Sequence, residues 1–268
     1  MADHFHKMHG LGNDFVVIDA RETPVSMTPA RARAIADRHN GIGCDQIILI
    51  EPATDADATM RIFNADGSEV GACGNASRAV ALLIGKRAEL ITAGGRITVQ
   101  PDGDGATVDM GFPHFGWDEI PLAYAMDTAV MPVGWEELTN PITVNVGNPH
   151  IVFFVADTDA VELDRLGPLI ENDPLFPERI NVNVATVTGP DSLNLRVWER
   201  GAGLTLACGT GACATAVAAI RSKRLSSPVT VSLPGGTLTI AWAPGEQITM
   251  TGPATHVFTG ETDWAQFG

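Results

Sequence analysis

The chain has 268 residues, 45% of them hydrophobic, and a formal net charge of −15. That length allows one large globular domain or two of ordinary size, and the negative charge argues against nucleic acid and anionic membranes as partners because it repels phosphate. No apolar run approaches the ~20 residues of a membrane span, and the first ten residues lack the apolar core of a signal peptide, so we expect a cytoplasmic protein.

Short runs of β-branched and aromatic residues, bounded by turn residues, predict strands in the first part of the chain. These runs lie at 15–19, 46–51 and 60–64. Between the first two, a helix is expected over 28–39, where Thr28 can cap the N-terminus and Pro29 takes the first helical position. The alanine-rich run after Cys73 favours a second helix, buried on most sides.

The middle of the chain has a different composition. Residues 111–141 contain four prolines, two of the five tryptophans and little periodicity, which predicts a linker. Beyond it, an alanine-rich run after Cys208 again favours a buried helix. The chain therefore has similar helices on both sides of the predicted linker.

The two halves of the sequence match when one is shifted by 135 residues, the separation of Cys73 and Cys208. Residues 60–84 then lie over 195–219 without a gap. The same shift places Asn13 on Asn148 and Gln46 on Asn181. Because the order of elements is the same in both halves, we predict an internal duplication that gives two similar α/β domains.

Four cysteines are too few for a disulfide framework, so we interpret them as free thiols. Cys73 and Cys208 each precede a glycine at a predicted helix start, where unpaired N–H groups favour an anion and lower a thiol pKa. The alternative is that both are small buried residues beside a glycine turn. The duplication favours reactive thiols, because Cys44 and Cys213 are not repeated and are interpreted as packing residues.

Two like halves related by a pseudo-twofold axis would place both repeated thiols at one cleft between the domains. There, one thiolate can remove the proton of a carbon acid while the opposing thiol delivers a proton to the other face. This chemistry inverts a stereocentre. It needs one base and one acid of similar pKa, which two cysteines provide.

The repeated polar residues suit an amino-acid ligand, because side-chain amides offer both donors and acceptors. The amide residues of this set are Asn13, Gln46, Asn64, Asn148 and Asn181. Arg200 can bind a carboxylate with two hydrogen bonds, and Glu199 can hold an ammonium group or act on a neighbouring thiol. His150 can assist proton movement or serve as a simple hydrogen-bonding residue.

Several motifs together resemble the diaminopimelate epimerase family over nearly the whole chain. They are GLGNDFVVID at 10–19, FNADGSE at 63–69 followed by CGN at 73–75, GNPH at 147–150, WERGAG at 198–203, ACGTGAC at 207–213, LPGG at 233–236 and MTGPA at 250–254. The resemblance implies a cofactor-independent epimerase that interconverts LL- and meso-diaminopimelate, a small-molecule substrate, for lysine and peptidoglycan synthesis. It also implies two α/β domains, each a curved sheet or barrel around a central helix.

The resemblance assigns roles by position. It implies that Cys73 and Cys208 are the paired acid and base, with Glu199 and His150 supporting proton transfer. It implies that the backbone at both Cys-Gly turns binds the reacting carboxylate. The residues that it implies as substrate contacts are Asn13, Gln46, Asn64, Gly74, Asn75, Asn148, Asn181, Arg200, Gly209 and Thr210. The expected domains are 1–114, completed by 256–268 if the last strand returns to the first domain, and 115–255.

The chain departs from the family pattern at two positions. Leu204 stands where the family commonly has glutamate, and Ala76 where it commonly has glycine. Both departures leave open the alternative of a related racemase for histidine or 4-hydroxyproline.

Other classes of protein remain as alternatives. One is a non-catalytic amino-acid-binding protein of the same fold. A thiol-disulfide oxidoreductase is disfavoured because Cys208 and Cys213 are separated by four residues, and zinc because His4, His6 and His9 lack a second pair of ligands. We therefore expect neither a metal nor another cofactor, and the sequence leaves a homodimer open as one oligomeric state.

Overall fold

The computed structural model describes residues 3–71 and 73–268, so Ala72 of the first Ala-Cys-Gly motif lies outside the described residues. The chain divides into two compact units. One comprises the residues up to Val108 together with Gly252–Gly268, and the other comprises Asp109–Thr251. Among the helices of the described residues, none is both long and apolar enough to cross a membrane.

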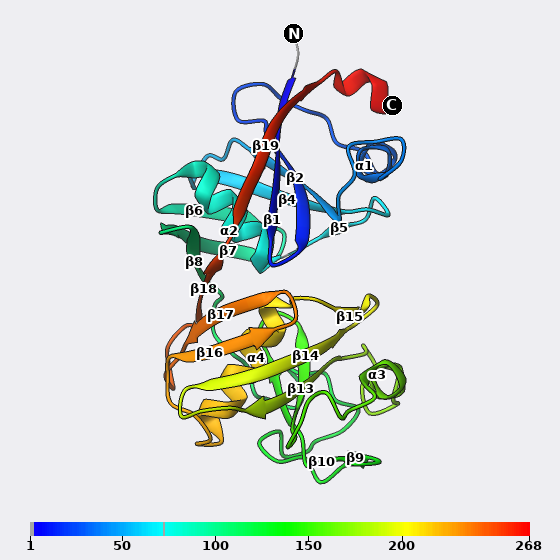
Figure 1. The fold of residues 1–268 in the computed structure, drawn as a ribbon, viewed down its shortest axis with the longest axis vertical. Helices are drawn as coiled ribbons and strands as arrows, with labels where there is room; N and C mark the ends of the chain where they lie inside the picture. The colour runs from blue at the N-terminus through cyan, green and yellow to red at the C-terminus, as the bar shows by residue number, and fades with distance from the viewer. Residues whose placement is uncertain (1–2, 72) are drawn as a thin grey trace. The chain divides into compact units, whose positions relative to one another are not determined.

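The first unit is built on a mixed sheet. Its strands are β1 (Asp3–Gly10), β2 (Asn13–Asp19), β3 (Gln46–Glu51), β4 (Ala58–Asn64), β5 (Glu69–Val70), β6 (Ala88–Thr92), β7 (Gly95–Asp102), β8 (Gly105–Asp109) and β19 (Thr255–Thr262). Strands β2 and β3 are parallel, as are β4 and β6, and the other pairs are antiparallel. In Figure 1 the red strand β19 lies along the blue strand β1, so opposite ends of the sequence share this sheet.

Within the part of this unit that the structure describes, the helices are α1 (Pro29–Ala36), α2 (Gly74–Ile84) and the 3-10 helix η1 (Trp264–Phe267). The predicted cap of α1 is confirmed, since Thr28 Oγ1 accepts from the Arg31 amide at 3.2 Å. The helix ends at Ala36 rather than at 39. Asp37 Oδ1 accepts from the backbone amides of the next residues, His39 and Asn40, and this turn stops the helix.

The second unit has the same kind of sheet. The strands of this sheet are β11 (Ile142–Asn145), β12 (Pro149–Phe154), β13 (Asn181–Val187), β14 (Ser192–Glu199), β15 (Gly203–Thr205), β16 (Val229–Leu233), β17 (Gly236–Ala241) and β18 (Thr249–Pro253). The short strands β9 (Gly134–Trp135) and β10 (Leu138–Thr139) pair separately, and the helices are α3 (Leu163–Glu171) and α4 (Gly209–Arg221). Strands β12 and β13 are parallel, as are β14 and β16.

The predicted duplication is confirmed by strand pairing. The order of parallel and antiparallel pairs from β1 to β8 recurs from β11 to β18. The register also recurs, because Phe15 pairs with Gln46 as His150 pairs with Asn181. The chain is therefore a mixed α/β protein with two copies of one topology.

The alanine-rich helices are the inner elements of the two units. Helix α4 packs against β11 to β14 and against β16 and β17, while α2 packs against β1, β2 and β7 (Figure 1). Alanine suits these positions, because its small side chain lets a helix approach the surrounding strands closely. The strands hold the N-terminus of each helix in a fixed place, where the repeated cysteines lie.

The prediction of a linker over 111–141 is wrong. Ile120, Leu122, Met131 and Leu138 are all buried and belong to the hydrophobic core that also contains Leu163 of α3. Apart from the short strands β9 and β10, this segment runs as irregular chain, which explains its lack of periodicity. It packs through single apolar residues instead of a regular face.

Candidate active site

In the first unit, Cys73 is the N-cap of α2. Its backbone is extended, with φ −153° and ψ 105°, and its sulfur accepts from the Ala76 amide at 3.5 Å. Cys73 is partly exposed, and Gly74 is the first residue of the helix. The amides of this first turn are therefore available near a thiol, as the sequence predicts.

Two predicted binding residues lie beside this thiol. Cys73 donates to Asn13 Oδ1, with sulfur and oxygen 3.8 Å apart, and Asn75 Nδ2 donates to the same oxygen at 3.4 Å. Asn75 is held by Arg78 Nη2, which donates to its Oδ1 at 2.8 Å. The structure thus brings together three residues that lie in two distant motifs of the sequence.

Gln46 and Asn64 form a second polar pair in this unit. They face each other across β3 and β4, and Gln46 Nε2 donates to Asn64 Oδ1 at 2.9 Å. Asn64 Nδ2 in turn donates to Ser68 Oγ at 3.1 Å. Among the described residues, the buried Gln46 Oε1 has no hydrogen-bond partner. This oxygen is an acceptor that a ligand ammonium group can satisfy.

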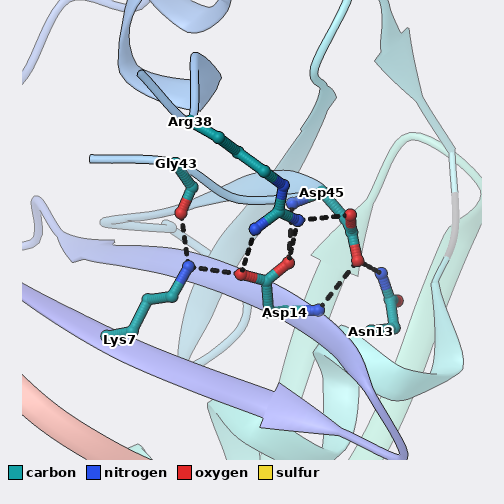
Figure 2. A network of polar contacts seen from close by, with 6 residues as sticks. All are labelled: Lys7, Asn13, Asp14, Arg38, Gly43 and Asp45. Carbon is teal, nitrogen blue, oxygen red and sulfur yellow. Dashed lines mark hydrogen bonds and ion pairs between the residues drawn. The ribbon is translucent and has the colours of Figure 1, made fainter. Parts of the chain in front are cut away.

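A charged network that the sequence analysis missed supports Asn13 (Figure 2). Asn13 Nδ2 donates to Asp45 Oδ2 at 3.1 Å. Arg38 Nη2 bridges Asp45 Oδ1 and Asp14 Oδ1, at 2.7 Å from each, and Lys7 binds Asp14 from β1. Asp14 and Asp45 directly follow and precede predicted binding residues, which is the signal in the sequence that could have identified them.

In the second unit, Cys208 is the N-cap of α4. Its sulfur accepts from the Gly211 amide at 3.3 Å, and Gly209 begins the helix. Thr210 Oγ1 lies 3.5 Å from the same sulfur. The local geometry therefore repeats that of Cys73, but Cys208 is only 3% exposed.

Burial changes the acidity expected of Cys208. It raises the pKa of this thiol well above its usual value, and the charge of Glu199 raises the pKa further, although hydrogen bonds from Thr210 and the Gly211 amide oppose the shift. The prediction of a lowered pKa is therefore wrong for Cys208 in the free chain, because desolvation of the thiolate outweighs the helix N-terminus. Glu199, whose Oε1 accepts from Thr205 Oγ1 at 2.6 Å, is placed to influence this proton.

Replacing Glu199 with glutamine should lower the pKa of Cys208, because the change removes a neighbouring negative charge that disfavours the thiolate. Alkylation of Cys208 by iodoacetamide, followed by peptide mass spectrometry across pH, should then have its midpoint at a lower pH than in the parent chain. Glu178→Gln is the matched control, since Glu178 is an exposed carboxylate of the same unit. An unchanged or higher midpoint in Glu199→Gln would contradict this assignment.

His150 lies inside the second unit, with none of its surface exposed. Its Nε2 lies 2.9 Å from Asn148 Oδ1 and its Nδ1 lies 3.1 Å from Asn183 Nδ2. Burial lowers the pKa of His150 to about 3, so the imidazole is neutral at physiological pH. Asn148 Nδ2 reaches Thr210 Oγ1 at 3.3 Å. The structure therefore connects His150 to the surroundings of Cys208 through Asn148 and Thr210.

The side chain of Asn181 is used to join neighbouring backbone segments. Its Nδ2 donates to the Pro149 carbonyl at 2.8 Å and its Oδ1 accepts from the Arg200 amide at 2.9 Å. Arg200 Nη1 donates to the Glu178 carbonyl at 2.9 Å. Asn181 is the first residue of β13, and Arg200 directly follows β14. Their predicted substrate contacts stay predictions.

The two unrepeated cysteines lie in different settings. Cys44 and Cys213 are both buried, and Cys213 is inside α4. Burial raises the pKa of Cys44 to about 12. These features agree with packing residues.

The two positions that depart from the family pattern, Ala76 and Leu204, lie in different settings. A side chain at Gly211 would place its Cβ 2.7 Å from Asn183 Oδ1 and 3.2 Å from the Cys208 sulfur, so glycine is required there. The equivalent position in the first unit holds Ala76, which is fully buried in α2. Leu204 on β15 is exposed, and it adds no charge near Cys208.

Residues 5–116 and 142–257 match the family model described as diaminopimelate epimerase. The diaminopimelate epimerase of Sphingopyxis alaskensis is 69% identical to this chain over 268 residues, and the match covers 100% of this chain and 100% of the relative. That of Rhizorhabdus wittichii is 68% identical over 265 residues, covering 98% of this chain and 97% of the relative.

Solved structures with the same fold are more distant in sequence. A phenazine biosynthesis protein of the PhzF family from Bacillus anthracis is 14% identical with a TM-score of 0.68, covering 98% of this chain and 99% of its own. A hydroxyproline epimerase from Agrobacterium vitis, with bound trans-4-hydroxy-L-proline, is 16% identical with a TM-score of 0.64, covering 97% and 92%. At these identities the likeness shows the fold alone.

Proposed function

Because the chain belongs to the diaminopimelate epimerase family, we propose that it interconverts LL- and meso-2,6-diaminopimelate in the synthesis of lysine and peptidoglycan precursors. The observation that carries this proposal is 69% identity to a curated diaminopimelate epimerase over the full length of both chains. The chain is accordingly an isomerase whose substrate is a small molecule.

The proposed reaction uses two cysteines and no cofactor. In one direction the Cys208 thiolate removes the proton from the α-carbon of one isomer, and the Cys73 thiol donates its proton to the opposite face of the same carbon. In the reverse direction Cys73 is the base and Cys208 is the acid. One proton is taken up and one is delivered in each turnover, so the stereocentre inverts without net proton transfer to the substrate.

Glu199 gives a route to the reactive form of Cys208. Since burial and this carboxylate both hold the thiol protonated in the free chain, a base must accept the proton before Cys208 can act. Glu199 is the carboxylate that acts on this thiol, so we propose that it accepts this proton. His150 supports this step indirectly, through hydrogen bonds that pass from His150 to Asn148 and from Asn148 to Thr210.

The proposed substrate contacts come from two helix N-termini and from a set of polar side chains. The backbone amides at Gly74-Asn75 and Gly209-Thr210 begin two helices, where the partial positive charge stabilises the reacting carboxylate as the α-proton leaves. We propose that the remaining polar groups bind the ammonium groups and the distal carboxylate. These groups come from Asn13, Gln46, Asn64, Asn148, Asn181 and Arg200.

A related racemase for histidine or 4-hydroxyproline is the main alternative within this chemistry. The solved hydroxyproline epimerase shares the fold at 16% identity, and Ala76 and Leu204 depart from the common family pattern. The much higher identity to diaminopimelate epimerases favours diaminopimelate.

The deciding experiment is a substrate panel. Purified protein treated with a chelator should convert LL-diaminopimelate to the meso isomer without an added cofactor, followed by chiral chromatography. Histidine and 4-hydroxyproline, tested beside it, should turn over at least about a hundredfold more slowly, because amide groups placed for one ligand are left unpaired by another. Turnover of either amino acid in preference to diaminopimelate would replace the proposed substrate. Binding without turnover of any of the three would favour an amino-acid-binding protein.

We also propose that the protein acts in the cytoplasm as a homodimer. Val257 and Phe258 on β19 are 54% and 48% exposed, which provides apolar surface for a second copy. Light scattering during size-exclusion chromatography tests the oligomeric state, and a mass equal to one chain at micromolar concentration would reject the dimer.

A further inference from the structure

The amide of Asn13 has only one orientation that satisfies its neighbours. Its Nδ2 donates to Asp45 Oδ2, and a carboxylate can only accept. The Asp14 amide donates to the same Oδ2 at 3.1 Å, and Arg38 binds the other oxygen, so Asp45 is itself held in place (Figure 2). Asn13 therefore turns its oxygen toward Cys73, where it accepts from the thiol.

A second, independent contact fixes the same orientation. Arg78 carries only donors, so Asn75 must present its oxygen to Arg78 and its NH2 group to Asn13. Asn13 Oδ1 thus accepts from both Asn75 and Cys73. In the first unit the hydrogen bonds run outward from the thiol, from Cys73 to Asn13 and then to Asp45.

The second unit contains a different chain of forced assignments. Asn183 Nδ2 donates to the Ile151 carbonyl at 3.0 Å, which fixes the amide with its NH2 group toward His150. The Nδ1 of His150 must then accept, so the proton lies on Nε2 and is donated to Asn148 Oδ1. Asn148 therefore turns its oxygen toward His150 and its NH2 group away from it.

The donation continues to the second cysteine. Asn148 Nδ2 donates to Thr210 Oγ1 at 3.3 Å, which leaves the proton of this hydroxyl for the Cys208 sulfur 3.5 Å away. In the second unit the hydrogen bonds run inward, from Asn183 through His150, Asn148 and Thr210 to the sulfur. The two equivalent asparagines, Asn13 and Asn148, therefore present opposite ends of their amides.

We propose that Asp45 and Asn183 are positioning residues that orient the two equivalent asparagines in opposite ways. Cys73 then meets the Asn13 oxygen, an acceptor, while Cys208 meets the Thr210 hydroxyl, a donor, in addition to the backbone amide that each sulfur accepts from. Neither residue is repeated, because the 135-residue shift maps Asp45 to Ile180 and Asn183 to Ile48. The duplication alone would not produce this difference. If the proposed epimerase function holds, on which the catalytic meaning of the proposal rests, Asn13 favours the protonated form of Cys73. At Cys208 the Thr210 hydroxyl stabilises negative charge and so opposes burial and Glu199, which hold that thiol protonated in the free chain.

The Asp45 arm compares two variants that lose the same charge. Asp45→Asn retains an oxygen that the Asp14 amide holds toward Asn13. Asp45→Ala removes this acceptor, so that only the weaker 3.4 Å contact from Asn75 opposes a turn of the Asn13 NH2 group toward the sulfur. The midpoint pH for iodoacetamide alkylation of Cys73, measured by peptide mass spectrometry, should fall by roughly one unit more in Asp45→Ala than in Asp45→Asn. Alkylation of Cys208 serves as the internal control and should be unchanged. Equal shifts of Cys73 in the two variants would mean that Asp45 acts by charge alone and would overturn this half of the proposal.

The Asn183 arm begins with the parent protein, so it does not depend on a variant that folds. In a ¹⁵N-labelled sample at neutral pH, two-bond ¹H–¹⁵N correlations should show His150 as the Nε2–H tautomer, its signals identified by their loss in His150→Gln. An Nδ1–H tautomer would overturn the second half. Asn183→Asp introduces a carboxylate of the same shape that can only accept, so the imidazole proton should move to Nδ1 of His150. In Asn183→Leu, which offers neither a donor nor an acceptor, both tautomers should be populated. Persistence of a pure Nε2–H tautomer in a folded Asn183→Asp variant would also count against the assignment.

These readouts require no turnover, so they separate this inference from the proposed function. A protein that shows the expected tautomer and Cys73 shift but epimerises none of the tested amino acids would retain the two environments and lose the proposed reaction. In an active protein, Asp45→Ala should lower kcat by at least about tenfold more than Asp45→Asn, after folding has been checked by circular dichroism. Equal kcat values for the two variants would show that the orientation of Asn13 has no effect on the chemistry.

Discussion

Replacing Cys208 with serine is expected to reduce the rate of diaminopimelate epimerisation by about 10²–10⁴-fold, the usual contribution of a positioned acid or base. A serine hydroxyl is far less acidic than a thiol, so it neither carries negative charge at neutral pH nor matches the pKa of its partner. Cys73→Ser should cause a loss of the same order. The rate is measured by chiral separation of the isomers, beside Cys213→Ser, which alters a buried residue outside the proposed chemistry.

Heavy water distinguishes the proposed pair of acids from a single base. Because a thiol carries one proton, the thiolate that removes hydrogen from the substrate retains it, while the other thiol delivers deuterium. Early in the reaction, product should contain deuterium and recovered substrate should remain nearly unlabelled. Comparable early labelling of substrate and product, or full activity in Cys208→Ser, would rule out the two-cysteine mechanism.

A large pH effect on stability is expected from His150. Its pKa is lowered to about 3 by burial, against 6.5 for the exposed side chain, so the unfolded chain binds a proton more readily than the folded one. The stability linked to this group is present in full above pH 6.5 and is lost as the pH falls toward 3. Between pH 7 and about pH 4, this single residue should remove about 3 kcal/mol from the free energy of unfolding.

The measurement compares urea unfolding of the parent and of His150→Gln across this pH range. Glutamine cannot take up a proton, so the variant should begin less stable at pH 7 but lose about 3 kcal/mol less on acidification. His4→Gln changes an exposed histidine on β1 and should leave the pH dependence of the parent intact. Parallel pH profiles for the parent and His150→Gln would show that burial of this imidazole does not depress its pKa.

The two cysteine-capped helices could be predicted from the sequence because the same local pattern occurs twice. Cys73 and Cys208 stand in similar local sequences, and alanine-rich runs after both lead into buried helices. Helix α3 was missed because Pro168 lies inside it and its N-cap, Glu162, makes no side-chain capping bond. Residues 111–141 were misread because isolated apolar side chains carry their packing, and such contacts leave no period in the sequence.

The supporting residues of the candidate site were harder to find for a different reason. Asn183 meets His150 because β12 and β13 run in parallel with a particular register, and that register is not visible in either strand alone. Asp45 reaches Asn13 because β2 and β3 are parallel neighbours. Local sequence therefore indicated the groups that could contact a substrate, while strand pairing determined which side chains hold them.

The pairing of β1 with β19 affects the order in which the chain can fold during translation. The second unit is one continuous segment, Asp109–Thr251, so all of its strands are available as soon as that segment has left the ribosome. The first unit begins to emerge earlier but lacks the strand that pairs with β1 until Thr262 has been added. The first unit is therefore synthesised first but completed last. One edge of β1 remains unpaired while the second unit folds.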